Sequence, residues 1–156
     1  MEEMMCYIPK TLEEALEIKS RHDVIVLAGG SDLMVSNKRT LGLAPKFDKP
    51  VMIVRNLPEL RGIYINEEGE CCIGAGCTSA QIAESTLCPW HLRQAASRMG
   101  AVALRNSATI AGNIANASPK GDTPGPLYML DARVKLSSVS GSREILVSDF
   151  IVKFRT

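Results

Sequence analysis

The sequence predicts an α+β fold with two lobes, a small parallel βαβ lobe followed by a larger lobe built on antiparallel strands. Two observations lead to this prediction. Apolar runs at residues 24–27 and 51–54 flank a segment of helical character, which is the order of a βαβ unit. Beyond Pro58, short strand-like segments alternate with polar turns, which is typical of antiparallel pairing. We place the first lobe in residues 1–55 and the second in residues 56–156.

The first lobe is expected to contain two helices and two strands. Thr11 and Glu14 have the spacing of a capping box, and the apolar residues that follow share one helix face. Residues 24–27 form a continuous apolar run, which predicts a strand buried on both faces. Asp32 is expected to cap a second helix that begins near Leu33. The apolar run at residues 51–54 is then the second strand of the βαβ unit.

The second lobe is expected to begin with two strands, at residues 62–65 and 71–75, joined by the polar turn 66–69. Thr78 and Gln81 form a second capping box and therefore predict a helix start.

Residues 89–99 are also expected to be helical. The alternating residues 133–136, the turn at Gly141 and residues 144–147 predict a hairpin near the end of the chain.

Composition narrows the function classes. The formal net charge is +1 and aromatic residues make up only 4%, which disfavours a nucleic-acid partner. No window approaches the ~20 apolar residues that span a bilayer, so no membrane association is expected. The acidic N-terminus lacks the apolar core of a signal peptide, and five irregularly spaced cysteines indicate reduced thiols. These features predict a cytoplasmic protein.

Four of the cysteines could be imagined as ligands of an iron–sulfur cluster. They are Cys71, Cys72, Cys77 and Cys88. Their spacing does not match the plant-type ferredoxin pattern, so we interpret them as thiols of the core.

Two turns of small residues carry the strongest functional signal. The first, residues 28–33, follows an apolar run and precedes the expected second helix, and the second is residues 109–113. Glycine lets backbone N–H groups approach an anion closely, and a helix N-terminus favours negative charge. Taken alone, residues 28–30 are also typical of a plain tight turn. Two such turns on one domain predict a site that grips a diphosphate from both sides, and FAD is the ligand we favour.

Further polar and basic residues lie near the turns. Asp122 belongs to a polar stretch, residues 114–127, that is either a binding loop or a surface loop that caps the following helix. Lys38, Arg39 and Arg105 are the nearby cations that could offset the charge of a bound anion.

Three segments, residues 28–33, 73–78 and 105–122, resemble the flavoprotein component of the molybdenum hydroxylases. This is the family of xanthine, carbon monoxide and nicotinate dehydrogenases, and the resemblance covers nearly the whole chain. It implies a two-lobed FAD-binding fold with FAD between the lobes. It also implies that both turns hold the diphosphate, that Asp122 binds cofactor hydroxyls or adjacent polar groups, and that the turn at Gly100 lies near the flavin. The expected cofactor-binding residues are Ala28, Gly29, Gly30, Ser31, Asp32, Leu33, Met34, Gly100, Thr109, Ile110, Ala111, Gly112, Asn113 and Asp122.

The resemblance also implies a function and its partners. A molybdenum-binding subunit would hydroxylate the substrate, and electrons would pass through [2Fe–2S] clusters of an iron–sulfur subunit to FAD, and then to NAD⁺ or another acceptor. No residue of this chain is expected to be catalytic or to bind a metal. The alternative is a scaffold module of the same complex that does not retain FAD. A self-contained FAD oxidase would need a substrate domain of its own.

Two departures from the family pattern qualify the resemblance. Ala111 stands where the family usually has a second glycine, and its methyl group is tolerated only where φ is negative. The family's flavoprotein also continues past the position of Thr156 into a small α+β C-terminal domain. We therefore expect a truncated form, an isolated domain or one half of a split subunit.

Overall fold

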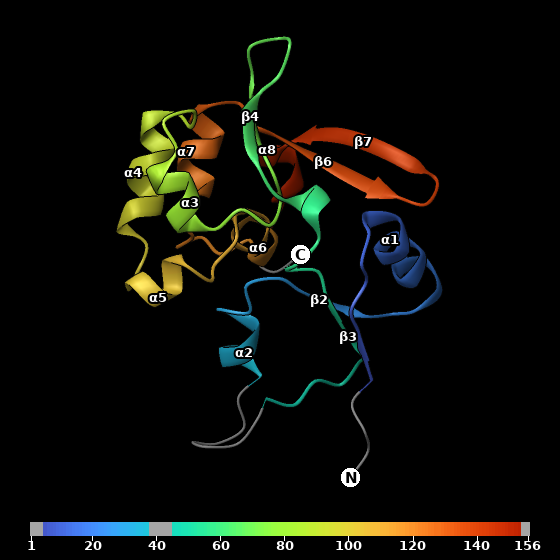
Figure 1. The fold of residues 1–156 in the computed structure, drawn as a ribbon. Helices are drawn as coiled ribbons and strands as arrows, with labels where there is room; N and C mark the ends of the chain where they lie inside the picture. Colours follow the sequence, from blue (N-terminus) through green and yellow to red (C-terminus); the bar gives the residue numbers. More distant parts are fainter. Residues whose placement is uncertain (1–4, 38–44, 154–156) are drawn as a thin grey trace.

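The fold combines one parallel sheet with two separate antiparallel strand pairs and a group of short helices (Figure 1). The computed structural model describes residues 5–37 and 45–153. The strands are β1 (Cys6–Tyr7), β2 (Ile25–Leu27), β3 (Val51–Ile53), β4 (Ile63–Ile65), β5 (Cys71–Ile73), β6 (Arg133–Ser138) and β7 (Gly141–Leu146). The helices are α1 (Leu12–Arg21), α2 (Leu33–Ser36), the 3₁₀ helix η1 (Pro58–Leu60), α3 (Ser79–Glu84), α4 (Trp90–Arg98), α5 (Val102–Arg105), α6 (Ile110–Asn116), α7 (Pro124–Met129) and α8 (Val147–Phe150).

The parallel sheet has the order β1-β3-β2, which confirms the predicted strand–helix–strand arrangement. Helix α1 begins where its cap predicts, because the side chain of Thr11 accepts a hydrogen bond from the N–H of Glu14. The Glu14 carboxylate reaches one residue further back than in a capping box and accepts from the N–H of Lys10, at 2.6 Å. Strand β1 was not predicted, since two residues are too few to show a pattern.

Burial differs between the two strands of the predicted unit. Central strand β3 has strands on both sides, and Val51 and Met52 are buried. Strand β2 lies at the edge of the sheet, and its middle residue Val26 is 43% exposed. The prediction that residues 24–27 are buried on both faces is therefore wrong for β2, because an edge strand has a neighbour on one side only.

The antiparallel strands of the second half form two distinct pairs. Strand β4 pairs with β5, and β6 pairs with β7, which confirms the predicted strands and the turn at Gly141, where φ is +135°. Among the described residues the two pairs do not join into one sheet, as a lobe built on an antiparallel sheet would require. Helices α3 to α8 make up much of this half, and Figure 1 shows α3, α4 and α7 on one side of β4 with β6–β7 on the other.

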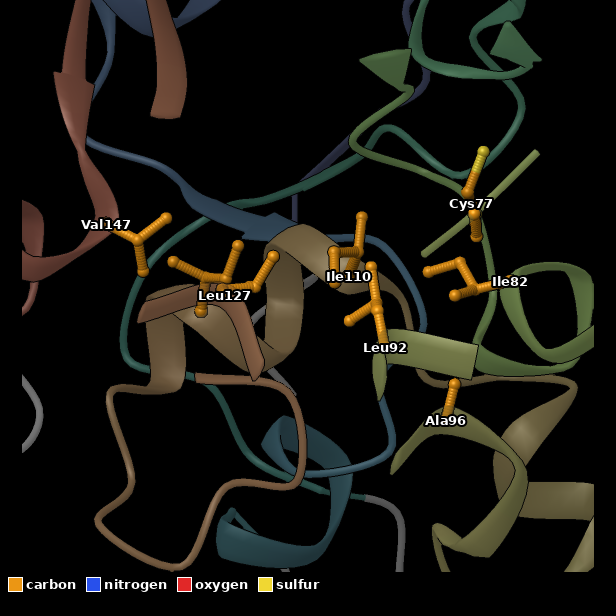
Figure 2. Packing of buried hydrophobic residues seen from close by; sticks show 9 residues of the cluster. Cys77, Ile82, Leu92, Ala96, Ile110, Leu127 and Val147 are labelled. Carbon is orange, nitrogen blue, oxygen red and sulfur yellow. The ribbon is translucent and has the colours of Figure 1, made fainter. Parts of the chain in front are cut away.

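The larger of two clusters of buried side chains joins these helices. Ile82 of α3, Leu92 of α4 and Ile110 of α6 point toward one another, as Figure 2 shows, with Leu127 and Val147 beside them. A smaller cluster packs Ala15 of α1 against residues of and around β3. The boundary between lobes at residue 55 stays a prediction.

The predicted helix starts agree with the structure to different degrees. The capping box of Thr78 and Gln81 is present with both of its bonds, and α4 lies within the predicted residues 89–99. Asp32 precedes α2 but its side chain caps no N–H group. Its backbone is helical, with φ −99° and ψ −48°, whereas capping needs an extended residue, and its carboxylate accepts from the hydroxyl of Ser36.

The helices of residues 5–37 and 45–153 are all too short or too polar to cross a bilayer.

Candidate functional site

The first turn presents a run of backbone donors. Strand β2 ends at Leu27, whose carbonyl accepts the last ladder bond from the N–H of Val54 at 2.9 Å. The chain then turns through Gly30, with φ +73°, and the N–H of Met34 closes the turn on the Gly30 carbonyl. In the described part of the chain, nothing accepts a hydrogen bond from the N–H groups of residues 29–33.

Successive backbone N–H groups without an acceptor are suited to binding an anion. Residues 28–31 are half-buried, so the donors are still accessible from outside. Helix α2 has only four residues, and therefore its dipole adds little. The N–H groups themselves supply the attraction for an anion.

The second turn uses its N–H groups internally. The N–H of Ile110 donates to the carbonyl of Cys77 at 3.0 Å, and that of Ala111 to Ala75 at 3.3 Å. The next two donate to Thr109, at its hydroxyl (3.2 Å) and its carbonyl (3.0 Å). The expectation that this turn exposes backbone donors is therefore wrong, because it opens α6 and pairs with the segment around residues 75–79.

Ala111 lies inside α6, where φ is negative, so its methyl group causes no backbone strain. The departure from the glycine of the family pattern is therefore tolerated. Whether residues 109–113 contact a cofactor through their side chains stays a prediction.

The structure packs the first turn on the two residues that precede the second turn. A Cβ atom placed on Gly29 would overlap the carbonyl oxygen of Ser107 and lie 3.2 Å from the Cα of Ala108. Only glycine lets the first turn pack this closely on the residues that lead into the second. The first turn is thus held against Ser107 and Ala108, directly before the second turn.

Asn113 holds the loop that contains Asp122. Its Oδ1 atom accepts from the hydroxyl of Thr123 at 2.6 Å and from the Thr123 N–H at 3.3 Å. Thr123 is buried, whereas Asp122 beside it is exposed. Asp122 is therefore placed next to α6 with its carboxylate open to solvent, and its contact with cofactor hydroxyls stays a prediction.

The turn at Gly100 joins α4 to α5 and connects to the second turn indirectly. Ser79 donates its N–H to the carbonyl of Ala108 at 2.9 Å and its hydroxyl to the sulfur of Met99 at 3.2 Å. Arg105 donates from Nη1 to the carbonyls of Met99 and Gly100, at 3.2 and 2.6 Å. Arg105 therefore holds this turn.

A different cation lies at the junction of the two turns. Nη2 of Arg55 is 3.5 Å from the carbonyl oxygen of Asn106. Sequence reasoning missed Arg55, although it directly follows the apolar run 51–54. Lys38 and Arg39 lie outside the described residues.

The cysteines belong to the packing. Cys77 and Cys88 are buried, as predicted for core thiols, and Cys71 and Cys72 are half-buried. Burial raises the pKa of Cys71 to about 11 and also raises the pKa of Cys88, so these thiols stay protonated at neutral pH. Within residues 5–37 and 45–153, no three His, Cys, Asp or Glu side chains are grouped to hold a metal ion.

Comparison with known proteins adds independent information. The family described as FAD binding domain in molybdopterin dehydrogenase matches residues 2–156. The nicotinate dehydrogenase FAD-subunit of Eubacterium barkeri is 34% identical over 158 aligned residues, covering 96% of this chain and 51% of that protein. The xanthine dehydrogenase FAD-binding subunit of Escherichia coli O157:H7 is 30% identical, covering 90% of this chain and 48% of that protein.

A solved structure also matches this chain over about half of its own length. Carbon monoxide dehydrogenase from Hydrogenophaga pseudoflava, in a form that lacks the Mo-pyranopterin moiety of its molybdenum cofactor, superposes with a TM-score of 0.84 at 26% identity. The superposition covers 99% of this chain and 54% of that one. The chain thus spans about half the length of the relatives that it matches.

Proposed function

The chain belongs to the family of FAD binding domains in molybdopterin dehydrogenases, and on this premise we propose that it binds FAD and forms the flavin-carrying part of an oxidoreductase. The observation that carries the proposal is the run of N–H groups at residues 29–33, which have no acceptor among the described residues. A diphosphate offers the acceptors that such a run lacks.

The donor set fits a dinucleotide. The N–H groups of residues 29–33 would hold the diphosphate, and the packing of Gly29 on Ser107 fixes their position. Residues 109–113 support that position by anchoring α6 to the segment around Ala75 and Cys77. When bound, FAD would supply the redox chemistry, and the protein supplies binding and orientation.

The complex to which the chain belongs is also part of the proposal. Its relatives are named as the FAD subunits of nicotinate and xanthine dehydrogenases. We therefore expect an iron–sulfur subunit and a molybdenum-binding subunit as partners, with electrons passing through FAD to NAD⁺ or another acceptor. A cytoplasmic location fits this role.

The first test is the visible absorption spectrum of the purified, desalted chain, with chromatographic identification of any released cofactor. If the protein is colourless, FAD is titrated and the quenching of its fluorescence is followed. Bound FAD supports the proposal and excludes the alternative of a scaffold that does not retain the flavin. A purified chain that carries no FAD and also binds none in the titration contradicts the proposal for this chain.

A pair of variants at Ser31 locates the site. The Ser31 side chain is half-buried in the run of donors. Ser31→Asp would place a negative charge beside the diphosphate and is expected to weaken FAD binding by about 10-fold or more. Ser31→Asn has a similar size and no charge, and its affinity should stay near that of the wild type. Equal affinity of both variants would place the diphosphate elsewhere.

A further inference from the structure

The proposed diphosphate site has donors but no positive charge of its own. Residues 28–34 and 107–113 together include one charged side chain, that of Asp32, and it is negative. A diphosphate beside it needs a compensating cation. We infer that Arg55 is this cation, a binding residue that pairs with the diphosphate. The inference rests on the proposed function, and it assigns to the diphosphate site a residue that lies outside both turns.

The sheet register places Arg55 beside the first turn. Strands β2 and β3 are parallel, with Leu27 opposite Ile53, and Val54 still bonds to Leu27 beyond the last paired residues. Arg55 lies two residues after Ile53, as Gly29 lies two residues after Leu27. Both therefore leave the sheet together at the carboxyl ends of neighbouring strands, where ligands of parallel sheets commonly bind.

The guanidinium group is directed to the junction of the turns. Its Nη2 atom is 3.5 Å from the carbonyl of Asn106, which precedes the Ser107 carbonyl that packs on Gly29. At that distance the contact is weak, so the group retains donors for a ligand. In the described part of the chain no carboxylate forms an ion pair with Arg55. Its charge is therefore available to an anion.

The surrounding residues fix the Arg55 backbone and leave its side chain exposed. Arg61 donates from Nη2 to the Arg55 carbonyl at 2.9 Å and to the Asn56 side chain at 3.3 Å. Arg105, by contrast, is directed at the carbonyls of Met99 and Gly100. Of these two described arginines, Arg55 is therefore the one whose charge is left available beside the run of donors at residues 29–33.

The experiment compares FAD affinity of the whole chain with that of Arg55→Gln, Arg55→Lys and Arg133→Gln, at low and at high salt. Arg133 lies on β6 and serves as the control for net charge. We expect Arg55→Gln to weaken FAD binding by about 10-fold at low salt and by less at high salt. Arg55→Lys should fall between, because it keeps the charge without the planar fork. ADP, which carries the diphosphate without the flavin, should lose affinity in the same order in competition with FAD.

The outcomes separate this inference from the proposed function. If the wild type does not bind FAD, both fail. If the wild type binds and Arg55→Gln binds equally well, or no worse than Arg133→Gln, only the role of Arg55 is overturned. A loss of affinity that is the same at every salt concentration would also overturn it, since that is the mark of altered packing. Thermal melting of each variant verifies that the compared proteins are folded.

Discussion

The two small-residue turns have similar sequences and different physical roles. In the first turn, the N–H groups of residues 29–33 have no acceptor among the described residues. In the second, the N–H groups of residues 110–113 are all bonded within the protein. The first turn therefore offers backbone donors to a ligand, whereas the second uses its backbone donors within the protein.

The difference shows what a turn needs in order to bind an anion. Glycine and small side chains allow close approach, but a donor is useful only if no carbonyl of the protein already accepts from it. The second turn lies beside the carbonyls of Ala75 and Cys77, whereas the first leaves the edge of its sheet at Leu27. Neighbouring backbone, more than composition, decides the role of each turn.

The largest expected effect comes from forcing the two turns apart. Gly29→Ala would place a methyl group on the Ser107 carbonyl and should lower the free energy of unfolding by about 3 kcal/mol. Gly125→Ala is the matched control, because a Cβ there meets no atom within 4 Å and the position is helical. It should be neutral or stabilising by up to about 1 kcal/mol. Urea unfolding measures both, and equal stability of the two variants would show that the turns are not in contact.

A smaller loss of stability should follow from breaking the hydrogen bonds between Asn113 of the second turn and Thr123. Asn113→Ala removes the acceptor of the buried Thr123 hydroxyl and should cost about 2 kcal/mol in unfolding free energy. Asn113→Asp keeps an acceptor oxygen in place and should retain more of the stability. If both variants unfold at the same urea concentration, the bond to Thr123 does not matter for folding.

The Thr109 cap of α6 should contribute still less to the free energy of unfolding. Thr109→Ala removes the hydroxyl that accepts from the Gly112 N–H and is expected to cost about 1 kcal/mol. Thr109→Ser restores the acceptor and should recover most of that loss. Chemical denaturation of the two variants checks the prediction, and a fully stable Thr109→Ala would mean that α6 needs no cap.

The smallest effect concerns the hydrogen bond that joins the start of α1 to the 3₁₀ helix η1. The Leu12 N–H donates to the Glu59 carboxylate at 2.8 Å, and backbone hydrogen bonds lower the pKa of Glu59. Because the pKa is lower in the folded state than in the unfolded one, the carboxylate stabilises the fold at neutral pH. That contribution decreases as the pH falls below about 4.3 and through the folded pKa.

Glu59→Gln tests this contribution. Between about pH 6 and about pH 3, the wild type should lose more stability than the variant, since only the wild type has the Glu59 carboxylate, which becomes protonated in this range. Thermal melting across that range measures the difference. Parallel curves would show that Glu59 makes no pH-dependent contribution.

The sequence by itself determined the local structure. Several elements depend only on neighbouring residues and on apolar patterns, which are visible in the sequence. They are the caps at Thr11 and Thr78, helix α4, the hairpin at Gly141 and the parallel unit of β2 and β3. The positions of both turns were predictable for the same reason.

Only the tertiary structure decided which backbone donors of these turns are left without an acceptor. Two acceptors of the second turn, the carbonyls of Ala75 and Cys77, lie more than thirty residues away in the chain, and Arg55 meets Asn106 across a separation of 51 residues. The exposure of Val26 likewise depends on β2 being an edge strand, and whether β4–β5 and β6–β7 join into one sheet depends on how they are placed in space. Hydrogen-bond satisfaction and burial are set by neighbours in space, and a linear pattern does not contain them.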